Sequence, residues 1–169
     1  LGATLEQAEK AEATLLPNIR ENMTANKARS MFRALQERLG LSDAELKKVV
    51  LGRPPVLGLS VDDTVLPKLA ALRQRLCLNE AELKKLVLSM PAVLGFSIEA
   101  NVLPSLAALQ SRLGLSEAEL RKIVLMHPAV LSLSVDENVL PSLAALQSRL
   151  QLSEAELKKV VLRLPQVLS

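Results

Sequence analysis

Residues 115–151, LSEAELRKIVLMHPAVLSLSVDENVLPSLAALQSRLQ, decide the fold because the chain states this stretch more than once. Residues 78–114 repeat it closely, residues 41–77 are a looser copy, and residues 152–169 match the first half of a further copy. Each full copy is 37 residues long. Self-similarity at such a period is typical of arrays in which each unit buries its apolar face against its neighbours. We therefore expect one repeat domain.

Composition favours helices for this array. Ala, Leu, Glu and Lys dominate the repeats, and Phe32 and Phe96 are the only aromatic residues, which leaves few good strand formers. Residues 1–40 are interpreted as a degenerate N-terminal repeat or cap, since residues 4–16 are helical in composition and Pro17 falls one period before Pro54. The predicted fold class is all-α, a right- or left-handed α-solenoid of about four helix-turn-helix repeats.

The first helix of each repeat is marked at both ends. Ser116 with Glu119 forms a capping box that satisfies free amides at the helix start. The same pattern recurs as Ser42 with Glu45, Asn79 with Glu82, and Ser153 with Glu156. The helix should end about eleven residues later, before a proline that disfavours helical backbone in the residue preceding it. These prolines are Pro54, Pro91, Pro128 and Pro165.

The second helix is predicted to start at Ser134 and to contain Pro141, which removes one backbone hydrogen bond and should kink it. Gly114 is expected to end the second helix of residues 78–114 as a left-handed cap. Gly40 is expected to end the last helix of residues 1–40 in the same way. Cys77 and Gln151 occupy this position in the other copies. Those two ends must either adopt a strained backbone or terminate differently.

With these fixed points in place, the repeat resembles that of the mitochondrial transcription termination factor (mTERF) family. The matching pattern is LGLS-x-x-E-L-x-K, Pro-x-hydrophobic-Leu, Ser-x-acid-x-Asn and Leu-Pro-x-Leu, carried here by residues 113–116, 119–122, 128–131, 134–138 and 140–143. The resemblance implies two helices and a short 3₁₀ turn per repeat, stacked into a solenoid. It also implies a location in mitochondria or chloroplasts, and binding of double-stranded DNA or structured RNA.

Basic residues recur at fixed repeat positions. One set of pairs lies in the first helix: Lys47 and Lys48, Lys84 and Lys85, Arg121 and Lys122, Lys158 and Lys159. A second set, late in the second helix, is Arg75, Arg112 and Arg149. Stacking would align each set as a column that could follow a phosphate backbone. The alternative interpretation is that the lysines form ordinary i,i+4 pairs within their own helix, with Asp43, Glu80, Glu117 and Glu154 as partners.

Charge and composition limit the kind of binding. The net charge is +3, modest for a nucleic-acid protein, so binding would depend on how charge is distributed over the faces. Trp and Tyr are absent, and residues 103–113 and 140–150 are identical. Without aromatic platforms or variable surface positions, base-specific reading is not expected.

We expect no enzyme activity, metal or cofactor. His127 is the only histidine, and no nucleophile and carboxylate accompany it at a triad spacing. Cys77 is a lone thiol, and the six glycines are scattered. No apolar run reaches the roughly 18 residues of a membrane span, and no small-molecule substrate is indicated.

Two functions remain. The first is an organelle protein that binds phosphates of duplex DNA or structured RNA, for example ribosomal RNA, in organelle gene expression. The second is a scaffold subunit of a large organelle assembly, such as a ribosome or membrane complex, acting through contacts with other proteins. Basic columns free of acid partners would favour the first, and exposed apolar side chains the second.

Overall fold

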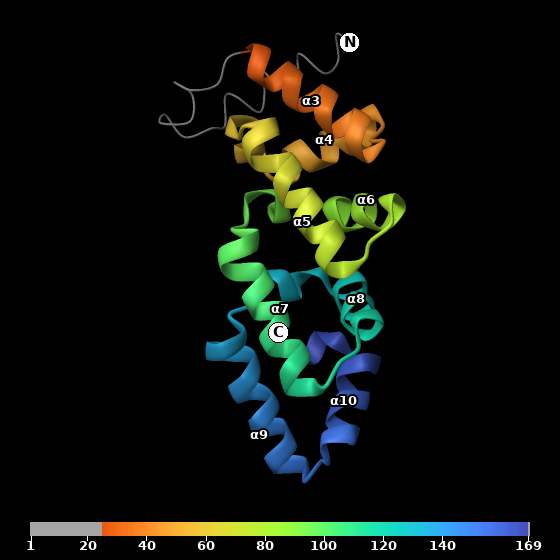
Figure 1. Cartoon of the computed structure of the whole chain (residues 1–169), viewed down its shortest axis with the longest axis vertical. Helices are drawn as coiled ribbons and strands as arrows, with labels where there is room; N and C mark the ends of the chain where they lie inside the picture. Colours follow the sequence, from red (N-terminus) through yellow and green to blue (C-terminus); the bar gives the residue numbers. More distant parts are fainter. Residues whose placement is uncertain (1–24, 169) are drawn as a thin grey trace. The chain divides into compact units, whose positions relative to one another are not determined.

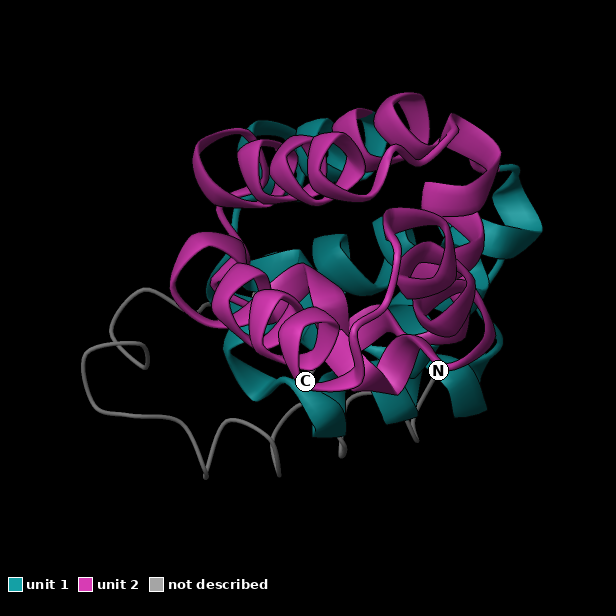
Figure 2. Cartoon of the chain, turned by 90° about the horizontal axis from the view of Figure 1, so that it is seen from below, with its two compact units in different colours: residues 1–70, 79–95 teal, residues 71–78, 96–169 magenta. Residues whose placement is uncertain are grey.

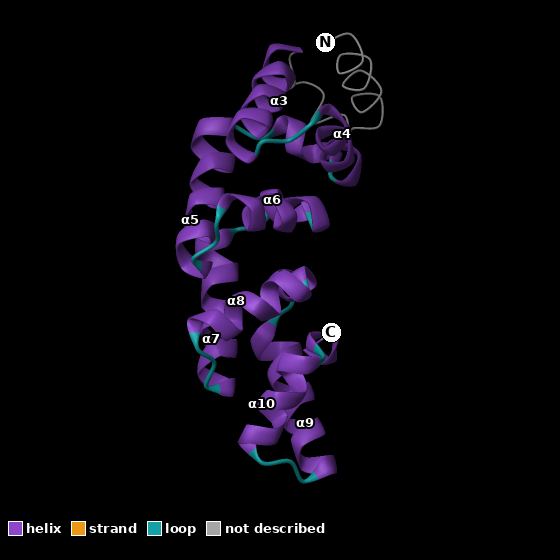
Figure 3. Ribbon diagram, turned by 90° about the vertical axis from the view of Figure 1, so that its right-hand side faces the viewer, coloured by secondary structure: helices purple, strands orange, loops and turns teal. Residues whose placement is uncertain are grey.

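The computed structural model describes residues 25–168, and every regular element within that range is helical (Figures 1 and 3). The α-helices are α3 (Ala25–Leu39), α4 (Asp43–Gly52), α5 (Leu66–Leu76), α6 (Glu80–Ser89), α7 (Leu103–Leu113), α8 (Glu117–Met126), α9 (Leu140–Leu150) and α10 (Glu154–Arg163). The predicted all-α repeat fold is confirmed. The part of the cap that we placed at residues 4–16 and Pro17 lies outside the described residues.

Short helical segments connect the α-helices within each copy. A 3₁₀ helix follows each first helix and begins at the expected proline: η1 (Pro54–Gly58), η3 (Pro91–Gly95), η5 (Pro128–Ser132) and η7 (Pro165–Leu168). A π-helical turn precedes each second helix: η2 (Val61–Val65), η4 (Ile98–Val102) and η6 (Val135–Val139).

The predicted capping boxes are present at all four first helices. At α8, the Glu119 amide donates to the Ser116 hydroxyl at 3.2 Å, and the Ser116 amide donates to the Glu119 carboxylate at 2.7 Å. Two amides that no helical carbonyl could reach are thereby satisfied. Helix α8 then ends one residue before His127, whose amide donates to the Ile123 carbonyl at 2.8 Å.

Ser134 caps the helical segment at the predicted position, but the segment begins with the π turn η6 and not with α-helix. Helix α9 starts at Leu140, so Pro141 lies in its first turn and not inside it. The preceding turn is π-helical, with the Val139 amide donating to the Ser134 carbonyl at 3.3 Å. A proline ring clashes with the carbonyl four residues earlier in an α-helix. The wider π turn is a way of relieving that clash.

Left-handed backbone ends the second helices whether or not glycine is present. Cys77 and Gln151 have φ of 49° and 51°, beside 59° and 55° at Gly40 and Gly114. The hydrogen bonds are equivalent as well. The Leu78 amide donates to the Arg73 carbonyl at 3.0 Å, and after Gly114 the Leu115 amide donates to the Gln110 carbonyl at 2.9 Å. Of the two outcomes the sequence allowed at Cys77 and Gln151, the strained one occurs.

The described residues form two compact units, 25–70 with 79–95 and 71–78 with 96–168 (Figure 2). In the first unit α4 packs against α3 and α6, and in the second α10 packs against α7, α8 and α9. Leu120, Ile123 and Val124 of α8 are buried, at the spacing of one helix face, whereas Ala118 is exposed. Among the described residues, no polar or charged side chain is buried.

Candidate nucleic-acid interface

The basic pairs of the first helices lie on α4, α6, α8 and α10, less than one turn after the glutamate of each capping box. Neighbouring residues of an α-helix point about 100° apart, so the two members of a pair face different surroundings. The structure separates them into two sets. Two of the first members, Lys84 and Lys158, contact earlier repeats, whereas all four second members are exposed.

Lys84 and Lys158 are the first members whose contacts define the first set, and we call them the inter-repeat lysines. The Lys84 ammonium lies 2.8 Å from the Glu45 carboxylate and donates to the Gly40 carbonyl at 2.7 Å. Lys158 makes the same two contacts two repeats along, with Glu119 at 2.8 Å and the Gly114 carbonyl at 2.8 Å. Each therefore ties its helix to the capped turn of an earlier repeat.

These contacts change the titration of the capping glutamates. The hydrogen bond from Lys84, followed by the amide of Ser42, lowers the pKa of Glu45 from 4.5 to about 2. Lys158 and the amide of Ser116 lower the pKa of Glu119 to about 2 in the same way. Both carboxylates therefore remain ionised well below the usual range of glutamate.

The interpretation as i,i+4 pairs is wrong for Lys84 and Lys158, because each binds an acid of another repeat instead of the acid four residues before it. Among the described residues Lys47 forms no ion pair with Asp43 either: Lys47 is exposed, and Asp43 accepts a hydrogen bond from Gln36 at 2.7 Å. Arg121, the remaining first member, is half-buried.

The second members form the other set, which we call the exposed lysine column. It consists of Lys48, Lys85, Lys122 and Lys159, all of them exposed and none in an ion pair with a described residue. Lys48 and Lys85 lie on the packed helices α4 and α6 of the first unit, and Lys122 and Lys159 on α8 and α10 of the second. Their amines are available to an external anion.

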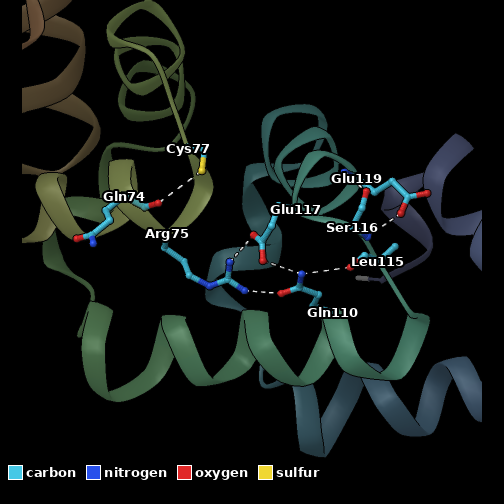
Figure 4. Close-up of polar contacts among 8 residues, drawn as sticks. All are labelled: Gln74, Arg75, Cys77, Gln110, Leu115, Ser116, Glu117 and Glu119. Atoms are coloured by element: carbon cyan, nitrogen blue, oxygen red, sulfur yellow. Dashed lines mark hydrogen bonds and ion pairs between the residues drawn. The ribbon is translucent and has the colours of Figure 1, made fainter.

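Two arginines of the second helices, Arg75 and Arg112, were predicted to contact phosphates but bind side chains of later repeats in the structure. Arg75 lies 2.6 Å from the Glu117 carboxylate and also donates to the Gln110 side-chain oxygen (Figure 4). The Gln110 amide in turn donates to Glu117 at 2.9 Å and to the Leu115 carbonyl at 3.1 Å. Hydrogen bonds from Gln110 and then Arg75 lower the pKa of Glu117. Arginine, glutamine and glutamate thus form one junction between repeats.

The same junction recurs one repeat later. Arg112 lies 2.7 Å from Glu154 and donates to Gln147 at 2.7 Å, while Gln147 donates to Glu154 at 3.0 Å. Gln147 and then Arg112 lower the pKa of Glu154. Arg149 occupies the equivalent position in the next copy, but it is exposed and makes no ion pair with a described residue. Arg75 and Arg112 are therefore structural contacts, and Arg149 is not engaged.

The glutamines were missed from the sequence, although a signal existed. Gln110 and Gln147 lie 35 residues after Arg75 and Arg112, and an acid follows each seven residues later. These offsets become meaningful only when one 37-residue repeat is known to stack on the next.

Two further features do not add to the basic surface. Arg29 and Arg33 of α3 line an open hollow of about 390 Å³, but Glu37 and Asp62 line it too, so the charges balance. Within the part of the chain that the structure describes, no group of three or more His, Cys, Asp or Glu could hold a metal ion. In that same part, no helix has the length and apolar character needed to cross a membrane.

Stacked helix pairs, proline-started 3₁₀ turns and cations at fixed repeat positions define an all-α helical-repeat protein. A family model, mTERF, matches residues 3–169, nearly the whole chain. The chain therefore belongs to the mTERF family. No curated protein matches it. Membership supports, in general terms, an organellar repeat protein that binds nucleic acid.

Proposed function

We propose that this protein binds duplex DNA or structured RNA in mitochondria or chloroplasts, by contacting backbone phosphates with the exposed lysine column. The observation that carries the proposal is the column itself. Four lysines recur at one repeat position, all are exposed, and none forms an ion pair with a described residue. Cations in such a position bind phosphates by releasing condensed counterions.

The chemistry of the column favours phosphates over bases. A lysine ammonium is a compact point charge without the planar fork that reads base edges. The chain also has no Trp or Tyr on which bases could stack. A folded RNA, ribosomal RNA among them, presents phosphates in a fixed arrangement and suits this kind of recognition as well as a DNA duplex does.

The scaffold function is a second candidate because apolar side chains are exposed. Leu150 and Leu164, at the last described helices, are 61% and 55% exposed. Such residues suit contact with another protein. The two functions differ in their response to salt, because only phosphate contacts make binding fall steeply as salt rises.

The test compares two double variants that remove the same charge from the same helices. Lys85→Ala with Lys159→Ala removes two members of the exposed lysine column, whereas Lys84→Ala with Lys158→Ala removes the inter-repeat lysines. Binding to labelled duplex DNA and to a folded RNA would be measured across a salt series. On duplex DNA, the first variant should reduce the slope of log affinity against log salt by about 2, at about 0.9 per lost phosphate contact. The second should leave the slope unchanged.

Two results would contradict the proposal. Equal reductions in slope would mean that bulk charge, and not the exposed lysine column, controls binding. A folded, helical wild-type chain that binds neither nucleic acid at low salt would favour the scaffold function instead.

A further inference from the structure

The first full copy of the repeat carries two cations at positions where the later copies have neither lysine nor arginine. Arg53 follows the last residue of α4, and Lys68 lies near the start of α5. The equivalents of Arg53 are Met90, His127 and Leu164, and those of Lys68 are Ser105 and Ser142. Because these two cations do not recur with the period, stacking of one repeat on the next does not require them.

The two side chains converge on the 3₁₀ helix η3 of the following copy. The Lys68 ammonium donates a long hydrogen bond to the Leu94 carbonyl, at 3.5 Å. The Arg53 guanidinium lies against the next residue, since a Cβ added at Gly95 would meet its Nη2 at 2.9 Å and its Nε at 3.3 Å. All four residues belong to the first compact unit, and described residues precede and follow them.

The charges of these two side chains are not neutralised within the described residues. Arg53 forms no ion pair and no side-chain hydrogen bond with any of them, and the carbonyl contact is the only one of Lys68. Both side chains are half-buried. Arg75 is half-buried too, but its guanidinium donates to Glu117 and Gln110. A partly desolvated guanidinium such as that of Arg53 gains most from an acceptor that comes from outside the chain.

A phosphate group suits this pair of donors. The guanidinium presents a planar fork of N–H groups and the ammonium a point charge, and phosphate has enough acceptor oxygens to bind both together. Gly95 is exposed, so an anion can reach the turn from solvent. The absence of a side chain at Gly95 also leaves the room that the guanidinium occupies.

We propose that Arg53 and Lys68 bind one phosphate group beside Gly95. The phosphate belongs either to a nucleic-acid backbone, in which case the site rests on the proposed function, or to a small free phosphate. The exposed lysine column offers an equivalent contact in each repeat, whereas this site occurs once in the described chain. It therefore holds one phosphate at a single defined place in the first unit.

The experiment follows the backbone amide signal of Gly95 by NMR in the full chain, during titration with inorganic phosphate and, separately, with short duplex DNA and a folded RNA. Arg53→Met with Lys68→Ser introduces residues that the next copy carries at the same positions, and circular dichroism would confirm its folding. Gly95→Ala keeps both charges but places a Cβ where the guanidinium lies, so the guanidinium must move. Arg29→Ala with Arg33→Ala is the control, because it removes two charges from exposed positions elsewhere in the same unit.

In the wild type, phosphate should shift the Gly95 signal saturably. The double variant and Gly95→Ala should each weaken phosphate binding about tenfold or more, because charge-assisted hydrogen bonds are lost, and the control should bind as the wild type does. If the phosphate belongs to a nucleic acid, duplex DNA should also shift the signal. The double variant should then reduce the slope of log affinity against log salt by about 1, the value for one phosphate contact.

A Gly95 signal that responds to neither phosphate nor nucleic acid would overturn the proposal, even if the chain binds nucleic acid through the exposed lysine column. A folded Gly95→Ala variant that binds phosphate as tightly as the wild type would overturn it too, because the position of the guanidinium would then not matter. Saturable binding of phosphate beside Gly95 by a chain that binds neither nucleic acid would support the site with a small phosphate as its ligand, and would contradict only the proposed function.

Discussion

Replacing Cys77 by glycine should stabilise the protein, because the residue ends α5 in a left-handed conformation with φ of 49°. The thiol contributes little there. It is exposed, and its only described hydrogen bond is a weak one to the Gln74 carbonyl at 3.8 Å. The surrounding backbone bonds are those found at Gly114 in the next copy. Glycine can therefore replace Cys77 without rearranging the turn.

The expected gain follows from two opposing terms. Left-handed backbone costs a residue with a Cβ about 1–2 kcal/mol. Glycine loses more conformational freedom on folding, a cost of roughly 0.5–1 kcal/mol. The net expectation for Cys77→Gly is a gain of about 0.5–1 kcal/mol in the free energy of unfolding. For a chain of this length that corresponds to an increase in Tm of about 1–4 °C.

The assay is urea unfolding followed by circular dichroism, with thermal melts alongside. Gly114→Ala is the matched control, since a Cβ at Gly114 would meet no atom within 4 Å and the substitution tests the backbone alone. It should destabilise the chain by about as much as Cys77→Gly stabilises it. Cys77→Ala retains the Cβ and should change stability little. If Cys77→Ala stabilises as much as Cys77→Gly, the left-handed strain is not the cause and the reasoning fails.

Two further predictions concern the contacts between repeats. The pKa values of Glu45 and Glu119 lie near 2 in the folded chain, so their contribution to stability is complete above about pH 4.5 and is lost as the pH falls toward 2. The urea midpoint of the double variant Lys84→Ala with Lys158→Ala should therefore depend less on pH across that range than the midpoint of the wild type. An identical pH dependence would show that these lysines are not its cause. Arg112→Ala should lower the urea midpoint at neutral pH, but by less than Leu109→Ala, which empties a fully buried site at a cost of about 2–5 kcal/mol. Because Arg149 is exposed, Arg149→Ala should leave that midpoint nearly unchanged.

Most of the fold could be predicted from the sequence because its signals are local. The capping box of Ser116 with Glu119 and the stop before Pro128 each involve a few consecutive residues, and both are confirmed. The π turn before Pro141 was not predicted, because proline removes an α-helical hydrogen bond in any context and the way the backbone accommodates this depends on packing. Cys77 shows the same limit: its position required a left-handed residue, but the sequence could not say whether the backbone would accept the strain.

The candidate site was predicted less completely, because its contacts cross repeats. An i,i+4 pair such as Glu154 with Lys158 is visible in one helix, but the real partner of Lys158 is Glu119, 39 residues earlier. Arg75 reaches Glu117 across 42 residues. Offsets close to one period appear only when the stacking geometry is known. The identities of the basic residues were therefore predicted, but not which of them hold the repeats together.

The net charge of +3 does not measure the positive charge that the chain exposes, because some lysines bind acids of other repeats while others remain exposed. Glu119 lies three residues before Lys122 and would partly neutralise it, but Lys158 engages that carboxylate. Glu156 holds the same position in the last repeat, where no described lysine of another repeat reaches it. Its pKa is lowered first by Ser153 and also by the charge of Lys159 within its own helix. The inter-repeat lysines Lys84 and Lys158 thus bind Glu45 and Glu119, the acids that lie three residues before Lys48 and Lys122, so the net charge of a repeat understates the charge that these two exposed lysines present.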